Sequence, residues 1–168
     1  MRAFVGLGSN LGDRLANLQR AVDLLGAAGG VRVLRSSRVY ESDPVGGPPQ
    51  PDYLNAVIEV ETDLDPADLL RACLAVEERM GRTRSVRWGP RIIDLDVLSY
   101  GEEEVALDAP PLTVPHPLMH ERAFVLLPLL ELDADPVLPG GRKIGELRLG
   151  PSSLSGVRPH APPLRVDG

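Results

Sequence analysis

The sequence predicts an α+β fold of the ferredoxin-like sandwich type, with helices on one face of an antiparallel sheet and an extra C-terminal loop and helix. Short segments with an apolar residue at every second position alternate with longer segments whose apolar residues recur every three or four positions. Their order is strand, helix, strand, strand, helix, strand. Two right-handed strand–helix–strand halves joined in this order form such a sandwich.

The first half begins with a strand-like segment over residues 2–8. Gly8 and Gly12 are expected to relieve steric strain in the turn that follows, and Asp13 is placed to cap a helix. Gly29-Gly30 ends this helix, whose apolar residues recur at helical spacing: Leu11, Leu15, Leu18, Val22 and Leu25. Residues 31–40 alternate again and predict the second strand.

In the second half, a loop rich in proline and glycine at 41–52 leads to a third strand at 53–62. Asp65-Pro66 is a typical helix start, with a capping acid and a proline at the first helical position, and predicts a second helix to residue 80. The remaining elements are a fourth strand at 92–100, a loop at 108–117, and a third helical segment at 119–132 that we expect to be interrupted near Pro128.

Length and composition indicate one domain, residues 1–149, followed by an extended, weakly ordered tail over residues 150–168. The 168-residue chain is 43% hydrophobic, which suffices for a core, and it has no apolar run of the roughly 18 residues that a membrane helix needs. The single cysteine, Cys73, is expected to be a core residue, since no disulfide or metal–thiolate cluster can form within the chain. We therefore expect a cytoplasmic monomer that binds neither membranes nor, with a net charge of -6, nucleic acid.

The residues from Gly81 to Val97 combine two opposite kinds of charge. Four arginines come first, with no acidic residue among them: Arg82, Arg84, Arg87 and Arg91. Asp94 and Asp96 follow within a strand-like alternation, which points both carboxylates to one face. The two carboxylates repel each other unless a cation such as Mg²⁺ lies between them, and guanidinium groups match phosphate oxygens. The alternative is a solvent-facing strand edge where acids and arginines pair. The arginines and the Trp-Gly-Pro turn favour a metal–phosphate site, and thus nucleotide chemistry.

Several segments, taken in order, resemble the 6-hydroxymethyl-7,8-dihydropterin pyrophosphokinase family of folate biosynthesis. They are GLGSNLGD (6–13), QPDYLNA (50–56), RWGPRIIDLD (87–96) and LTVPH (112–116), and RAF (122–124) also fits. The third segment is the most specific, and the resemblance spans residues 3–147. It implies transfer of the terminal pyrophosphoryl group of ATP to the hydroxymethyl oxygen of the pterin, with release of AMP.

For the nucleotide, the resemblance implies that Asp94 and Asp96 hold two Mg²⁺ ions, and that they act in catalysis together with Arg82 and Arg91. The residues implied to contact ATP are Glu77, Arg82, Arg84, Trp88, Arg91, Thr113, His116 and Arg122. Three residues depart from the family pattern at the nucleotide end: Leu74, Pro111 and Pro117.

For the pterin, the resemblance implies a ring sandwiched between Tyr53 and Phe124, with Asn55 at its edge. Backbone groups near Ser42 and Val45 would complete this pocket, and Trp88 would close over it. On the residues alone, Asn55 is either an exposed polar residue of a strand or an amide that offers a donor and an acceptor to a flat heterocycle.

Two other functions stay open at this point. One is a different Mg²⁺-dependent nucleotidyl or phosphoryl transferase, and the other is a non-catalytic binding or regulatory module, for which such folds are often used. The acidic pair distinguishes them, because a regulatory module has no need of Asp94 and Asp96 on one face.

Overall fold

The computed structural model describes residues 1–44, 49–81, 91–141, 143 and 156–166, and its main feature is a six-stranded antiparallel sheet. The strand order is β5-β1-β4-β3-β8, and β2 also pairs with β4. The strands of this sheet are β1 (Arg2–Ser9), β2 (Val31–Ser36), β3 (Val39–Ser42), β4 (Tyr53–Thr62), β5 (Asp94–Tyr100) and β8 (Val157–Ala161). β1 lies between β4 and β5, so β1 and β4 are central strands and β5 forms one edge of the sheet.

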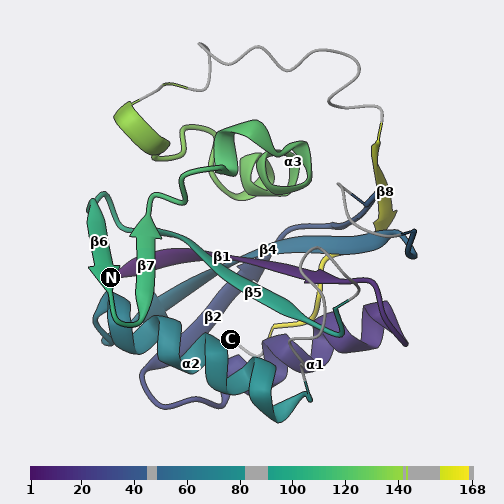
Figure 1. The fold of residues 1–168 in the computed structure, drawn as a ribbon, viewed down its shortest axis with the longest axis horizontal. Helices are drawn as coiled ribbons and strands as arrows, with labels where there is room; N and C mark the ends of the chain where they lie inside the picture. The colour runs from purple at the N-terminus through teal and green to yellow at the C-terminus, as the bar shows by residue number, and fades with distance from the viewer. Residues whose placement is uncertain (45–48, 82–90, 142, 144–155, 167–168) are drawn as a thin grey trace.

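Helices cover both faces of this sheet. Helices α1 (Arg14–Gly26) and α2 (Pro66–Arg79) lie on one face, and α3 (Ala123–Leu132) lies on the other (Figure 1). Both N-caps predicted from the sequence are present. The side chain of Asp13 accepts a hydrogen bond from the Ala16 N–H at 3.1 Å, and that of Asp65 accepts one from the Asp68 N–H at 2.8 Å. The two helices of the predicted sandwich thus lie on one face of the sheet, and the extra C-terminal helix, for which the sequence predicted no face, lies on the other (Figure 1).

The main core lies between the sheet and the α1–α2 layer. Alternate residues of β1, β4 and β5 point into it, and all are at most 3% exposed: Ala3, Val5, Leu7, Leu54, Ala56, Ile58, Val60, Leu95 and Val97. Because side chains alternate along a strand, the intervening residues face the other side of the sheet. That second face carries a smaller apolar cluster under α3: Val57, Leu98, Met119, Leu126, Leu129 and Leu138.

The segment 31–40 is two strands rather than the single strand that we predicted. Ser37 interrupts it: its backbone N–H donates to the Val57 carbonyl at 2.8 Å, and its hydroxyl accepts from the Val57 N–H at 2.9 Å. A side chain thus replaces a backbone carbonyl in the ladder with β4. The predicted apolar face of the first helix was wrong at its first two positions, because Leu11 and Leu15 are 42% and 39% exposed and lie outside the core.

The predictions that relied on proline positions were wrong near the C-terminal end of the domain. The predicted loop at 108–117 contains half of a hairpin, in which β6 (Val105–Asp108) pairs with β7 (Pro111–Val114). The segment 119–132 begins with a short 3-10 turn (Met119–Glu121), and α3 then continues through Pro128 without interruption. A second 3-10 turn spans Pro139–Gly141.

The tail also differs from its prediction, since residues 157–161 form β8, which pairs with β3. Cys73 is fully buried, as expected of a core residue. Within the ranges that the structure describes, no helix combines the length and apolar character needed to cross a membrane.

Candidate active site

A cavity of about 610 Å³ lies on the second face of the sheet, beside the start of α3. Strands β1, β4 and β5 form its floor, and its sides come from the chain around residues 42–44, 121–125 and 156–157. Eight of the predicted site residues line it: Ser42, Tyr53, Asn55, Arg91, Asp94, Asp96, Arg122 and Phe124.

Glycines leave room for these side chains on the floor. In the pairing of β1 with β5, Gly8 is opposite Asp94 and Gly6 is opposite Asp96, so each aspartate has a neighbour without a side chain. A Cβ atom at Gly8 would lie 3.4 Å from Asn55 Oδ1 and 3.5 Å from the Tyr53 ring, and one at Gly6 would lie 3.5 Å from the Leu98 side chain. These are contact distances without overlap, so the space above the glycines belongs to the cavity.

Asp94 and Asp96 both line the cavity, while Leu95 between them is buried in the main core. Arg91 is close to this pair, with its Nε 4.0 Å from Asp94 Oδ1. Two carboxylates, neighbouring space and access to water or phosphate fit a hard cation such as Mg²⁺, which takes few protein ligands. Among the described residues, no group of three or more His, Cys, Asp or Glu side chains is placed to hold a metal ion. Within the described part of the chain, Asp94 and Asp96 are thus the pair of carboxylates that fits such an ion.

A cationic and aromatic wall faces the aspartates from the N-terminal end of α3. The guanidinium carbon of Arg122 lies 5.7 Å from the centre of the Phe124 ring, which is within the range of a cation–π contact. His116 is half-buried and close enough to Arg122 to be affected by its charge. Burial, with a smaller contribution from the Arg122 charge, lowers the pKa of His116, and its Nδ1 accepts a hydrogen bond from the Leu118 N–H at 3.1 Å. A neutral imidazole therefore stands beside a permanently charged guanidinium.

Strand β4 carries two of the residues predicted to bind a flat ring. Tyr53 lines the cavity at the start of β4, and Asn55 is 5% exposed one pleat further along that strand. The Asn55 amide donates to the Ser42 hydroxyl at 2.6 Å, which fixes the amide and points its oxygen toward Gly8. Asn55 is thus a buried, oriented amide and not an exposed polar residue.

The remaining predicted residues do not line the cavity or lie outside the described residues. Glu77 is 6% exposed on α2, and its carboxylate accepts a hydrogen bond from the Leu95 N–H at 2.8 Å. Thr113 is exposed on β7, and His116 is half-buried beside the wall. Four predicted residues fall outside the described ranges: Val45, Arg82, Arg84 and Trp88.

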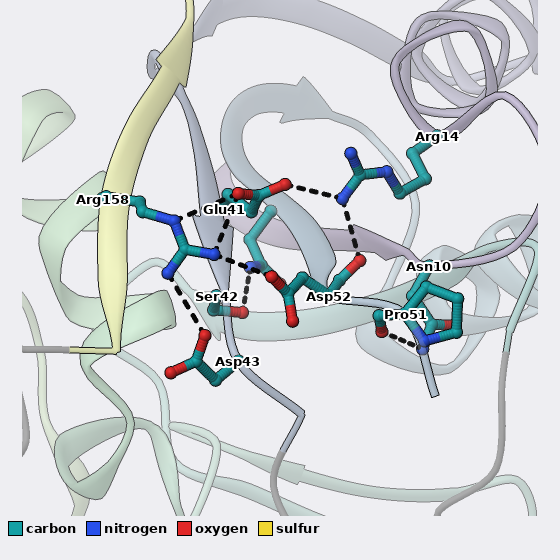
Figure 2. Close-up of polar contacts among 9 residues, drawn as sticks. Asn10, Arg14, Glu41, Ser42, Asp43, Pro51, Asp52 and Arg158 are labelled. Carbon is teal, nitrogen blue, oxygen red and sulfur yellow. Dashed lines mark hydrogen bonds and ion pairs between the residues drawn. The ribbon is translucent and has the colours of Figure 1, made fainter. Parts of the chain in front are cut away.

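Sequence reasoning missed a group of residues that fasten the rim. Asn10 is 1% exposed; its amide donates to Gln50 Oε1 at 2.8 Å and to the Pro51 carbonyl at 3.0 Å, and its Oδ1 accepts from the Arg91 N–H at 2.7 Å. Figure 2 shows the bond from Asn10 to Pro51 and, nearby, the charged residues Arg14, Glu41 and Arg158. The signal available in the sequence was Asn10 itself, a polar residue placed directly after a buried strand.

Comparisons with known proteins identify the family of this chain. The sequence profile of the 7,8-dihydro-6-hydroxymethylpterin-pyrophosphokinase (HPPK) family matches residues 4–134. The Methylorubrum extorquens protein named 2-amino-4-hydroxy-6-hydroxymethyldihydropteridine pyrophosphokinase is 44% identical to this chain over 158 residues, which cover 93% of this chain and 98% of the relative. The protein of that name from Bacillus subtilis is 47% identical over 130 residues, covering 77% of each.

The fold has relatives among solved structures. The Plasmodium falciparum HPPK-DHPS crystal structure with pteroate superposes with a TM-score of 0.60 at 15% identity, over 77% of this chain and 38% of that chain. A second HPPK-DHPS crystal structure, in complex with substrates, gives a TM-score of 0.59 at 13% identity and covers 78% of this chain and 40% of that one. The structural likeness establishes the fold, and the profile and sequence identities establish the relationship. This chain belongs to the 7,8-dihydro-6-hydroxymethylpterin-pyrophosphokinase family.

Proposed function

We propose that the chain uses this cavity to transfer the terminal pyrophosphoryl group of ATP to the hydroxymethyl oxygen of 6-hydroxymethyl-7,8-dihydropterin, with release of AMP, in folate biosynthesis. The names of its relatives at 44% and 47% identity support this activity. The observation that carries the proposal is the placement of Asp94 and Asp96 together in a cavity of about 610 Å³ that also holds guanidinium and aromatic groups.

Transfer of a phosphoryl-type group depends mainly on in-line positioning and on neutralising phosphate charge. Asp94 and Asp96 would hold Mg²⁺, two ions by the family resemblance, and bound Mg²⁺ neutralises the phosphates and polarises the attacking hydroxyl. Arg91 and Arg122 both line the cavity, where their forked donors can bind phosphate oxygens.

The pterin would occupy the part of the cavity between β4 and α3. Tyr53 and Phe124 line it from these two elements, which supports a ring held between aromatic faces. Ser42 fixes the Asn55 amide, whose oxygen can then accept from the amino edge of the ring. An aromatic sandwich with one oriented amide is a combination suited to a flat, polar bicycle.

The other predicted residues keep their proposed roles on the strength of the family resemblance. These are Arg82, Arg84, Trp88, Glu77, Thr113 and His116 at the nucleotide, and Val45 at the pterin. For Glu77 the geometry supports an indirect role, because its carboxylate binds the Leu95 N–H between the two aspartates.

The strand order supports a ferredoxin-like core, formed by β5-β1-β4 with β2 and β3 on the far edge of β4. We also infer a cytoplasmic monomer that acts on small molecules and does not bind nucleic acid, consistent with its dependence on ATP and its net charge of -6.

A product assay tests the function. Purified protein incubated with ATP, Mg²⁺ and 6-hydroxymethyl-7,8-dihydropterin should form AMP and the pterin diphosphate, and omission of either Mg²⁺ or the pterin should abolish AMP formation. ADP as the product would identify an ordinary kinase instead. If the protein binds ATP and the pterin in stoichiometric amounts but forms no product, it is a binding module.

A further inference from the structure

We infer that the C-terminal segment 156–166 forms part of the pterin-binding site, and that Arg158 is a positioning residue for that substrate. This inference rests on the proposed function. The profile of the family ends at residue 134, so the segment lies beyond the part of the chain that the profile matches. Gly156 and Val157 themselves line the cavity, and Arg158 comes next in the chain.

The segment is fastened at both ends. At its start, the Gly156 carbonyl accepts from the Asp43 N–H at 3.0 Å, and β8 pairs with β3 so that Val157 is opposite Ser42. At its end, Leu164 is 7% exposed in the main core. The backbone of Arg165 exchanges hydrogen bonds of 2.9 and 3.0 Å with the Gln19 side chain of α1. The position of β8 is therefore fixed by the body of the domain.

Arg158 connects three carboxylates from different parts of the rim (Figure 2). Its Nε donates to Glu41 Oε1 at 3.0 Å, its Nη1 to Asp43 Oδ1 at 3.2 Å, and its Nη2 to Asp52 Oδ2 at 2.8 Å. Glu41 is on β3, Asp43 follows that strand, and Asp52 immediately precedes β4. A single planar guanidinium thus joins the end of β3, the residue that follows it and the residue that precedes β4, in addition to the backbone pairing of Ser42 with Tyr53.

These three acids flank the residues that we propose contact the pterin. Ser42, between Glu41 and Asp43, accepts the bond that orients Asn55, and Tyr53 follows Asp52 directly. A shift of Asp43 or Asp52 would move Ser42 or Tyr53 with it. The aspartates of β5 are on the other side of β1 from β4 and β3. The nucleotide end of the cavity is therefore farther from the clamp, as we call Arg158 with its partners Glu41, Asp43 and Asp52.

Charge explains why the clamp depends on arginine. The remaining cation of the group, Arg14, already donates to Glu41 Oε2 at 2.9 Å and to the Asp52 carbonyl at 3.0 Å. Without Arg158, the three carboxylates would repel one another, and Arg14 would be their remaining cationic partner among the residues that the structure describes. The Glu41 side chain is 20% exposed, so solvent screens its pair with Arg158 less than the pairs of Arg158 with Asp43 and Asp52, which are 62% and 39% exposed.

Steady-state kinetics on the full chain test the inference. Arg158→Ala should raise the KM for the pterin by about fivefold to twentyfold, the effect of losing several partly screened charge pairs. The KM for ATP and the kcat should stay within about twofold of wild type, because those contacts are made elsewhere in the cavity. Arg158→Lys, which keeps the charge but offers a single point of contact, should give an intermediate pterin KM and serves as the test variant if the alanine variant does not fold.

Arg38→Ala is the matched control. Arg38 is also a half-exposed arginine of the β3 region that bonds a carboxylate, through Nε to Glu131 Oε1 at 3.2 Å, and it does not line the cavity. Its loss should leave the pterin KM unchanged. An unchanged pterin KM in Arg158→Ala, an equal rise for both substrates, or the same rise in Arg38→Ala would overturn the inference.

Amide hydrogen exchange separates this inference from the proposed function. In the ligand-free protein, the peptide covering residues 39–44 should exchange faster in Arg158→Ala than in wild type, while residues 94–100 should not change. If wild type shows no turnover, the proposed function fails, yet this comparison still decides whether Arg158 positions the rim. Equal exchange in residues 39–44 would show that it does not.

Discussion

Gly8→Ala should stabilise the fold and impair the enzyme at the same time. Gly8 has an ordinary strand conformation and lies between Asn55 of β4 and Asp94 of β5 on the cavity floor. The new methyl group would lie 3.4 Å from Asn55 Oδ1 and 3.5 Å from the Tyr53 ring, so it fits the ligand-free protein. Alanine restricts the unfolded chain more than glycine does, which should raise the free energy of unfolding by about 0.4–1 kcal/mol.

The same methyl group occupies space that a bound pterin would need. Overpacking of this kind costs about 1–3 kcal/mol, which corresponds to a rise in the pterin KM of about fivefold to a hundredfold. Urea unfolding followed by circular dichroism gives the first quantity, and the AMP assay at varied pterin concentration gives the second.

Gly26→Ala is the matched control for this experiment. A Cβ atom there, at the end of α1, would lie 3.7 Å from Val33 and far from the cavity residues. It should raise the stability without changing the KM. The reasoning is refuted if Gly8→Ala leaves the pterin KM unchanged, or if it destabilises the fold by more than about 1 kcal/mol, since the floor would then be closed packing and not open space.

Three further predictions concern residues around the site and the tail. Because the folded pKa of His116 lies below its unfolded value of 6.5, the unfolded state takes up the proton first, and stability should fall as the pH drops from 6.5 through the folded pKa. An NMR titration should find the His116 midpoint below 6.5, and Arg122→Gln should move it upward; no movement would exclude the charge effect. Leu164→Ala should lower the free energy of unfolding by about 2–4 kcal/mol, whereas Leu118→Ala should change it by under about 0.5 kcal/mol. Equal effects of the two substitutions in urea unfolding would mean that the tail is not packed in the core. Burial, reinforced by nearby carboxylates, raises the pKa of Cys73 to about 12, so a thiol reagent at pH 8 should label it only after unfolding, and rapid native labelling would contradict its burial.

Strands β1, β4 and β5 and the first two helices could be predicted because a single physical rule governs each of them. Alternation in these strands indicates which face is buried, and it also predicts that Asp94 and Asp96 share a face. The capping acids Asp13 and Asp65 identified the helix starts for an equally local reason.

The elements that escaped prediction depend on partners distant in the sequence. Ser37 keeps the alternation of its neighbours, so the pattern cannot reveal that its hydroxyl replaces a ladder carbonyl. Pro111 and Pro159 indicate loops locally, but both lie on strands that pair with one neighbour, where a missing N–H is tolerated. Pro128 remains inside α3, which packs over the apolar cluster on the second face of the sheet.

Only part of the candidate site, likewise, could be predicted from the sequence. Residue type and spacing predicted a metal–phosphate site at Asp94 and Asp96, and the family resemblance supplied the aromatic residues proposed to bind the pterin. The rim could not be predicted, since Arg158 meets Glu41 and Asp52 across separations of more than a hundred residues, 117 and 106 positions respectively. For Glu77 the sequence suggested a nucleotide contact, whereas its observed partner, the Leu95 N–H, is a backbone group that no side-chain pattern reveals.

Binding of Mn²⁺, a paramagnetic substitute for Mg²⁺, tests the central claim most directly. Electron paramagnetic resonance can count the bound ion in the presence of a non-hydrolysable ATP analogue in wild type, Asp94→Asn and Asp96→Asn. Asp108→Asn, at an exposed position on β6 that does not line the cavity, serves as the control. Strong binding in wild type and in the control, with most of the bound Mn²⁺ lost in each of the other two variants, is the predicted result. Undiminished binding in both Asp94→Asn and Asp96→Asn would contradict it.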